Sequence, residues 1–514
     1  MSRSLRTGCG GKLTEQKQTG GQLGQPTPFW RAVVRYGIAV VILVFYVTVY
    51  LHFNYTPDDT YIYLQYAKHI AHGQGFSFND GTPSYGITGP LWALLIAGGT
   101  GLGLDPYIVA KTLDIVFASM ALLALYALAI YLLHDRVYAL VAVWIFSFDA
   151  WFLRWSSSGM ESSLAILLTL ITVWYAYRRE YVVTAFVAAV LTLVRPEGAL
   201  LFAVVLLDIL VNAKDRAIAR RALFFSILTY GAIVAVWLVY AYFAFGTIVP
   251  NTLQAKSTSG VSLAVLWFTA TSIVKILSVT QILSLVLLIV GVVVTARSYS
   301  WRMIKEEGFP LLWVAVLPLF YIILNVQVTS RYLLLILPYV AVYGVWGIKR
   351  LEVASILSPQ RALLALLVVA GLSLAENQYV YHKKVVPHME NFTEGMNECL
   401  KPMAYWLKSN APERATVLTP DIGMLGYISG RTIYETAGLV TPAMKRAFRG
   451  VTYDEGMMEH RYEHVIEPDY IIDRSPSPER LASDSLRPVM TRTFFGLGLT
   501  KPEPVYYTLY KVVK

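Results

Sequence analysis

Long apolar runs recur along most of this chain, and they constrain its fold more than any other feature. A run of about 20 apolar residues matches the hydrocarbon thickness of a bilayer. Hydrophobic residues make up 56% of the sequence and charged residues only 15%, against roughly 25% charged residues in ordinary soluble domains. The sequence therefore predicts an α-helical polytopic membrane protein with about eleven transmembrane helices. The predicted spans are 33–53, 107–133, 137–153, 160–177, 181–194, 197–212, 222–245, 281–296, 309–326, 332–348 and 362–376.

Basic residues gather in the loops on one side of these spans. Most of the basic loop residues fall in 134–136, 178–179, 214–221, 297–305 and 349–361. The positive-inside rule places such loops in the cytoplasm, and with them the N-terminus. The formal net charge of +10 is thus explained by membrane topology, and no nucleic-acid partner is expected.

The spans divide the chain into three predicted parts. Residues 1–30 are rich in Gly, Gln and Lys and are expected to be a disordered cytoplasmic tail. Residues 31–376 form the transmembrane module, with a first outer loop at 54–106. Within that loop the apolar, Gly-rich stretch 88–104 fits an interfacial or re-entrant helix.

The C-terminal part of the chain, 377–514, is polar in character. It contains Pro-rich turns and short β-like runs such as Thr416–Thr419 and Tyr470–Ile472. An odd number of spans places this part on the side opposite the N-terminus. The sequence therefore predicts an extracytoplasmic soluble domain of the α/β class.

Two adjacent carboxylates, Asp58 and Asp59, follow the first span directly and stand beside the turn-forming Pro57. An aspartate can act as a general base on an acceptor hydroxyl, or it can bind a divalent cation together with a neighbour. Alternatively, the two residues are solvated or cap the next helix. Further polar motifs on the same side of the membrane favour the catalytic interpretation.

Three of these motifs carry carboxylate, imidazole or guanidinium groups. His69 and His72 lie in a loop rich in Gly and aromatic residues, which suits a sugar-binding surface. Alternatively, they lie on the solvent-exposed face of an interfacial helix. Glu161 opens a span, where the helix dipole favours a carboxylate, or it contacts substrate. Arg195 and Glu197 surround a Pro, either as a structural ion pair or to direct a cation toward a lipid phosphate.

Two basic residues, Lys256 and Arg331, run against the charge asymmetry, because both lie in loops of the outer side. A phosphate partner explains such residues, and Arg can bind phosphate with two parallel hydrogen bonds. The alternative is that both side chains extend to lipid headgroups.

Taken together, the motifs resemble the polytopic GT-C glycosyltransferases that use polyprenyl-phosphate-linked sugars. The closest likeness is to the mycobacterial terminal arabinofuranosyltransferase type and related bacterial membrane glycosyltransferases. The likeness spans most of the chain and depends on the order of the motifs. These are Asp58–Ile62, Gly73–Phe76, Gly86–Trp92, Ser158–Glu161, Leu193–Gly198, Pro250–Thr252, Arg331–Tyr332, Asp421–Arg431 and Ala437–Pro442.

The resemblance implies a multi-pass protein of the bacterial cytoplasmic membrane that transfers a sugar, arabinofuranose or a hexose, with inversion. The donor is a polyprenyl-phosphate-linked sugar, and the acceptor is a cell-envelope glycan or glycolipid. The base role falls to Asp58 first and Asp59 second, and phosphate contact to Lys256, Arg331 and Arg195. The substrate-binding candidates are Tyr61, His69, His72, Glu161, Glu197, Asn251, Tyr332, Asp421 and Tyr427.

Cofactor use is only partly constrained by the sequence. The chain shows no P-loop and no dinucleotide-binding fingerprint, so no nucleotide site is expected. Members of the family that the chain resembles differ in metal use. The resemblance therefore leaves open whether Asp58 and Asp59 hold a divalent cation (Mg, Mn or Ca).

Two other functions compete with this interpretation. One is a lipid or sugar transporter or flippase, but such proteins place ionisable residues near the membrane midplane, whereas the unusual residues here gather on the outer side. The other is a transferase that modifies lipid A or moves an oligosaccharide, which only the acceptor distinguishes.

Overall fold

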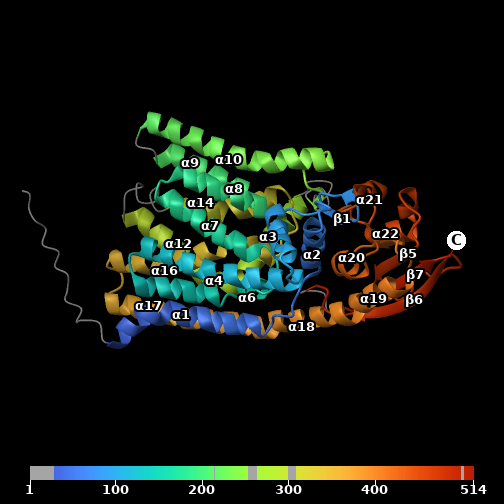
Figure 1. The fold of residues 1–514 in the computed structure, drawn as a ribbon. Coiled ribbons are helices and arrows are strands. Elements are labelled where there is room, and N and C mark those ends of the chain that lie inside the picture. The colour runs from blue at the N-terminus through green and yellow to red at the C-terminus, as the bar shows by residue number, and fades with distance from the viewer. Residues whose placement is uncertain (1–27, 213–214, 253–262, 299–307, 499–502, 514) are drawn as a thin grey trace, which may run out of the picture.

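A bundle of helices is followed along the chain by a region built on a β-sheet (Figure 1). The computed structural model describes residues 28–212, 215–252, 263–298, 308–498 and 503–513. The helices before the sheet region are α1 Pro28–Tyr50, α2 Asp58–Ala71, α3 Pro90–Gly101, α4 Pro106–Leu133, α5 Arg136–Ser147, α6 Ala150–Trp155, α7 Ser162–Tyr177, α8 Tyr181–Val194, α9 Glu197–Asn212, α10 Arg216–Phe245, α12 Leu263–Ser298, α14 Phe309–Ile323, α15 Ser330–Leu333, α16 Leu337–Val353 and α17 Pro359–Val380. A short hairpin, β1 Ser77–Asn79 and β2 Thr82–Pro83, follows α2.

Each predicted span overlaps one of these helices. Within the described residues, four helices are long and apolar enough to cross a membrane: α4, α10, α12 and the helix that begins with α17. The protein is therefore a multi-pass membrane protein. The exact count of about eleven spans and the direction in which they cross stay predictions. The stretch predicted as an interfacial or re-entrant helix is α3, which packs on α2, α4 and α8.

Two predicted span boundaries were wrong for identifiable reasons. The run 137–153 is split between α5 and α6, because the Asp149 side chain accepts hydrogen bonds from the backbone N–H groups of Trp151 (2.9 Å) and Phe152 (3.1 Å) and so starts a new helix. The run 281–296 is only the second half of α12. That helix is kinked at Gln281, where φ is −131°, so hydropathy alone found only its more apolar half.

The C-terminal region, here residues 377–513, is joined to the bundle by a helix. The chain stays helical from Pro359 to Asn410, so the predicted boundary at 376/377 lies inside a helix. Figure 1 shows this helix along one edge of the molecule, from α17 to α19. Its parts after α17 are the π-helical turn Tyr381–Val385, α18 Val386–Gly395, the π-helical turn Met396–Leu400 and α19 Lys401–Asn410.

A five-stranded mixed sheet forms the core of the C-terminal region, in the order β4-β3-β5-β7-β6. The two runs predicted as β-like are strands β3 and β5. β3 pairs in parallel with β4 and β5, and β7 pairs antiparallel with β5 and β6. The description of this region as an extracytoplasmic α/β domain stays a prediction. Its elements are β3 Thr416–Thr419, α20 Gly423–Ser429, β4 Thr432–Glu435, α21 Pro442–Ala447, α22 Tyr453–Met458, a 3-10 turn Arg461–His464, β5 Tyr470–Ser475, β6 Leu486–Phe494 and β7 Val505–Val512.

The C-terminal region docks on the loop that the sequence predicts at 54–106, because α20 and the edge strand β4 lie against α2 and β1. The Asn79 side chain exchanges two hydrogen bonds of 2.8 Å with the backbone of Ile433 in β4. A Cβ on Gly423 would lie 2.0 Å from the backbone oxygen of Asp58, so only Gly permits this close approach of α20 to α2. Docking thus fixes the C-terminal region directly beside the acidic pair.

Candidate functional site

The acidic pair opens α2, and its two members face different surroundings. Adjacent residues on an α-helix are turned by about 100° from one another. Asp59 lines a cavity between the helical bundle and the C-terminal region. Asp58 instead faces the first turn of α20. The sequence could not separate the two roles, because the direction of each side chain depends on where α20 docks.

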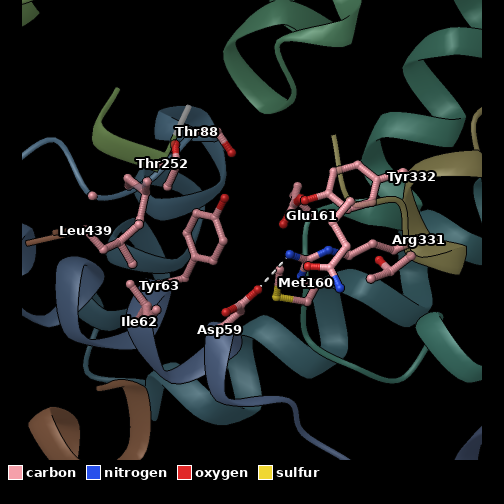
Figure 2. A pocket seen from close by; sticks show the side chains of 14 residues that line it. Asp59, Ile62, Tyr63, Thr88, Met160, Glu161, Thr252, Arg331, Tyr332 and Leu439 are labelled. Atoms are coloured by element: carbon pink, nitrogen blue, oxygen red, sulfur yellow. Dashed lines mark ion pairs between the residues drawn. The ribbon is translucent and has the colours of Figure 1, made fainter. Parts of the chain in front are cut away.

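The cavity beside Asp59 has a volume of about 430 Å³. Figure 2 shows the Asp59 and Glu161 carboxylates and the Tyr63 ring around the same hollow, with Leu439 on the side away from Arg331. Leu439 brings the C-terminal region into the wall, and the Asn251 side chain donates to its backbone oxygen (3.0 Å). The lining residues are Asp59, Ile62, Tyr63, Gly86, Ile87, Thr88, Met160, Glu161, Thr252, Gln327, Thr329, Arg331, Tyr332 and Leu439.

A second, more apolar cavity of about 220 Å³ adjoins the first. The two cavities share Thr88, Glu161, Thr252, Arg331 and Tyr332 in their walls, and we call this shared wall the neck. The site therefore combines a larger chamber with a smaller, more apolar one, and Arg331 and the buried carboxylate of Glu161 lie in the wall that they share. The residues found only in the second cavity are Arg195, Pro196, Glu197, Phe320, Tyr321, Leu324 and Val326.

An ion pair joins Asp59 to Arg331 across the first cavity, with 2.7 Å between Oδ2 and the guanidinium (Figure 2). The Arg331 side chain is 13% exposed and that of Asp59 48%. The guanidinium also lies over the rings of Trp155 and Tyr332, at 5.7 and 5.4 Å from their centres. Arg331 is thus held in place by aromatic stacking, and its planar fork has more donors than the one carboxylate uses.

Asp58 is bound to backbone amides of the C-terminal region. Its two carboxylate oxygens each accept a hydrogen bond of 2.8 Å, from the N–H groups of Gly423 and Met424. Burial, and to a smaller extent the nearby Asp421, raise the pKa of Asp58 from 3.8 to about 7, against the opposing effect of the two amide donors. Asp59 lines the cavity and Asp58 does not, so the geometry favours Asp59 as candidate base; which of the two acts as base stays a prediction.

The raised pKa of Asp58 predicts how docking depends on pH. A carboxyl group whose pKa is higher in the folded protein stabilises that state fully below pH 4, and this stabilisation is lost as the pH rises through 7. We expect the apparent Tm of the purified protein to fall between pH 5 and pH 8, and to fall less in Asp58→Asn. Burial raises the pKa of Glu435 to about 7 as well, so the difference between the two proteins isolates Asp58. Equal pH dependence in both would contradict the prediction.

Arg195 is held between two buried carboxylates. It donates to both oxygens of Glu197 (3.3 and 2.9 Å) and to Oε1 of Glu161 (3.3 Å). The Tyr321 hydroxyl donates to Glu197 as well (2.6 Å). This cluster brings together three predicted site residues, and two carboxylates against one guanidinium leave it with a net negative charge. Arg195 is therefore less suited than Arg331 to hold a phosphate.

A buried Lys and Asp from α4 hold the turn that carries Glu161. Lys111 donates to the backbone oxygens of Tyr55 and Ser157. Asp114 accepts from the backbone N–H of Gly159 (2.9 Å), whose φ of +78° requires glycine-like freedom. Both side chains are fully buried. The partners of Asp114 lie 44–49 residues away in the chain, so local sequence patterns do not predict these contacts.

Replacing Asp114 by Ala is expected to destabilise the protein by about 3 kcal/mol or more, because the buried N–H of Gly159 and the hydroxyls of Ser158 and Ser163 would lose their acceptor. The apparent Tm in detergent measures this effect. Asp135, which caps α5 through Val137 (2.8 Å), is a matched control, since an N-cap Asp→Ala change costs only about 0.5–2 kcal/mol. Equal losses of Tm in the two variants would show that the buried Asp114 carboxylate is dispensable.

Seven of the predicted site residues lie outside the lining of both cavities. Asp58 is described above. His69 is buried, with its ring bonded to the Ser77 backbone oxygen (2.9 Å) and 3.2 Å from Asp80, whereas His72 is exposed. Asn251 holds Leu439 without lining the cavity itself.

The other three, Tyr61, Asp421 and Tyr427, belong to the docking surface and the C-terminal region. Tyr61 and Tyr427 pack on each other with ring centres 5.9 Å apart. Asp421 accepts two hydrogen bonds from Arg474 (3.1 and 3.0 Å) and one from a tyrosine hydroxyl. Their proposed contact with substrate stays a prediction. Lys256, the remaining phosphate candidate, lies outside the described residues.

Solved structures of other proteins share the fold of this chain over most of its length. ArnT from Cupriavidus metallidurans, bound to undecaprenyl phosphate, superposes with a TM-score of 0.56 at 12% identity over 94% of this chain and 98% of ArnT. Its apo form gives the same TM-score at 11% identity, over 93% and 98% of the two chains. The chain has a GT-C fold. The arabinofuranosyltransferase AftD from mycobacteria shares it with a TM-score of 0.50 at 15% identity, over 93% of this chain but only 42% of AftD.

Similarity at the level of sequence identifies no function for this chain. One family model, described as a domain of unknown function (DUF8728), matches residues 388–510, which is most of the C-terminal region. No curated protein sequence matches the chain.

The acidic pair of this GT-C fold does not fit a shared divalent cation. Both oxygens of Asp58 accept from backbone N–H groups, and Asp59 is paired with Arg331. Hard cations require several oxygen ligands that are free of competing donors. Among the described residues no group of three or more His, Cys, Asp or Glu side chains is placed to hold a metal. We therefore derive no step through a metal at this pair.

Sequence reasoning missed most of the lining of the first cavity, including Tyr63, Thr88, Thr252 and Leu439. Each lies within or beside a motif that was noted, but none carries a charge, so charge asymmetry gave no reason to select it. Thr252 directly follows Asn251, and Leu439 lies in the loop after β4. Only the folded arrangement identifies them as neighbours of Asp59.

Proposed function

We propose that the protein is a membrane glycosyltransferase that moves a sugar from a polyprenyl-phosphate donor to a hydroxyl group of a cell-envelope glycan or glycolipid on the outer face. Arabinofuranose and hexoses are the sugars considered. The observation that carries this proposal is the Asp59–Arg331 pair in a GT-C fold: both residues line the first cavity, and Arg331 also lines the second, more apolar one. It joins a base, a phosphate-binding cation and a lipid-compatible space.

The two cavities divide the donor between them. The second cavity is lined by Phe320, Leu324 and Val326 and accommodates the first units of the polyprenyl chain. The phosphate lies against Arg331 at the neck, and the sugar extends into the first cavity beside Asp59. The ArnT structure was determined with undecaprenyl phosphate, and AftD is an arabinofuranosyltransferase by name, which supports a donor of this class.

The reaction is a single displacement with inversion at the anomeric carbon. The acceptor oxygen forms the new bond while the bond to the phosphate oxygen breaks, and its electron pair goes to the phosphate. Asp59 takes the proton of the attacking hydroxyl. Arg331 stabilises the charge that develops on the leaving phosphate. Because Arg331 is also the partner of Asp59, a phosphate that engages the guanidinium releases the carboxylate to act as base.

Sugar transfer by the purified protein tests this function. The protein in detergent is supplied with undecaprenyl-phosphate-linked arabinofuranose, glucose, mannose and galactose, with isolated cell envelopes as the source of acceptor. We expect one donor to yield labelled envelope and free undecaprenyl phosphate. Failure of every donor to release lipid phosphate, while the protein still binds undecaprenyl phosphate, would support the transporter alternative over an enzyme.

A further inference from the structure

The neck between the two cavities contains buried polar atoms that the proposed chemistry does not use. Glu161 and Thr252 both line the neck and are only 4% and 8% exposed. Among the residues that the structure describes, neither Oε2 of Glu161 nor Oγ1 of Thr252 has a hydrogen-bond partner. Buried polar atoms are nearly always paired, so two orphaned atoms on one cavity point to a ligand.

The other carboxylate of this cluster shows the contrast. Oε1 of Glu197 accepts from Arg195 and Tyr321, and Oε2 accepts from Arg195. Glu161 uses only Oε1, at 3.3 Å from Arg195. Both oxygens of Glu197 are thus satisfied, whereas Oε2 of Glu161 has no hydrogen-bond partner. In Figure 2 the Glu161 carboxylate points into the hollow between Tyr63 and Arg331.

The chemistry of these atoms restricts the ligand. An ionised carboxylate oxygen can only accept a hydrogen bond, so the group that satisfies Glu161 must be a donor. A phosphate cannot serve, because it would bring two negative charges together. A sugar bonded to a phosphate at Arg331 necessarily has its ring beside the same neck, and hydroxyl groups are the donors that it carries.

We propose that Oε2 of Glu161 accepts a hydrogen bond from one hydroxyl group of the donor sugar, that Thr252 faces the same ring, and that this contact selects the sugar to be transferred. The inference rests on the proposed function and deepens it. Glu161 is suited to this task because its position is rigid: the preceding turn is fixed by Asp114 through the N–H of Gly159. A site built to bind a hydroxyl rejects the analogue that lacks it, since the buried acceptor is then unpaired.

Mono-deoxy analogues of the accepted donor test the inference, each compared with the intact donor by kcat/KM for lipid phosphate release. For wild type we expect one analogue to be at least about 100-fold worse than the intact donor. In Glu161→Ala this ratio should fall to within about threefold, because the acceptor for that hydroxyl is gone. Thr252→Val keeps the shape of the side chain and should lower discrimination against at least one analogue about tenfold.

Glu197→Ala is the matched control. It removes the other carboxylate on Arg195 and is expected to lower activity, but the ratio between intact and deoxy donor should stay at the wild-type value. A merely structural role of Glu161 would lower both rates together and leave the ratio unchanged. If Glu161→Ala does not fold, Glu161→Gln replaces it, and at least a tenfold loss of discrimination is then expected.

The outcomes separate this inference from the proposed function. Release of lipid phosphate from intact donors by wild type, with no deoxy analogue rejected or with a ratio that survives in the Glu161 variant, overturns the inference alone. Absence of release from every intact donor overturns the proposed function and the inference with it.

Discussion

Replacing Asp59 by Asn is expected to lower the rate of sugar transfer by about 10²–10⁴-fold, the usual contribution of a positioned general base. The amide has nearly the same shape as the carboxylate and can still contact Arg331, but it cannot take the proton of the attacking hydroxyl. Binding of the donor should change much less than the maximal rate. Steady-state kinetics of sugar transfer, with KM and kcat determined separately, checks this expectation.

Asp58→Asn is the matched control, since it makes the same chemical change one residue away. An Asn side chain offers only one acceptor oxygen for the two amides of Gly423 and Met424, so we expect weaker docking, a lower apparent Tm and a moderate loss of activity. The decisive comparison is between the loss of transfer rate and the loss of apparent Tm in Asp58→Asn. If Asp58→Asn lost the greater part of the rate at unchanged Tm, the assignment of the base to Asp59 would be wrong.

The difference between these two residues shows what the sequence could and could not predict. The acidic pair itself stands out because two carboxylates directly follow an apolar run. The distinction between them depends on α20, which lies more than 360 residues away in the chain and becomes a neighbour only through docking. Local patterns carry no information about such a contact. The pair could therefore be found from sequence, but the order given to it there, Asp58 before Asp59, could not take this contact into account.

The helical bundle was largely predictable for a related reason. Apolar helices depend on local composition, and each predicted span overlaps a helix. The errors arose where a polar side chain or the tertiary structure overrode hydropathy. Asp149 starts a new helix inside an apolar run, and the helix from Pro359 continues past its apolar part to Asn410 because its polar half packs in the C-terminal region instead of among apolar helices.

The charged residues of the sequence identified part of the lining of the two cavities. Arg331, Arg195, Glu161 and Glu197 were selected as charged residues in loops or at the start of a span on the predicted outer side, and all four line one or both cavities. Their pairing was not predicted, and it changes their interpretation. Arg195 is committed to two carboxylates, whereas Arg331 has a single, more exposed one.

Arg331→Ala is therefore expected to reduce kcat by about 10²–10³-fold, the effect of removing a charge-stabilising donor from a transition state. Arg331→Lys should recover only part of this loss, because an ammonium cannot form two parallel hydrogen bonds with a phosphate. Inhibition by undecaprenyl phosphate gives an independent measure, and its inhibition constant should rise in both variants. Transfer assays on the same preparations supply kcat.

Arg154 provides the matched control for this result. Its guanidinium also lies over Trp155, at 5.0 Å, and it donates to the Tyr55 hydroxyl (3.1 Å), but it lines neither cavity. Arg154→Ala should thus leave inhibition by undecaprenyl phosphate within about twofold of wild type. An unchanged inhibition constant in Arg331→Ala would place the phosphate elsewhere. Loss of inhibition in Arg195→Ala would then identify Arg195 as its partner, in spite of the two carboxylates that surround it.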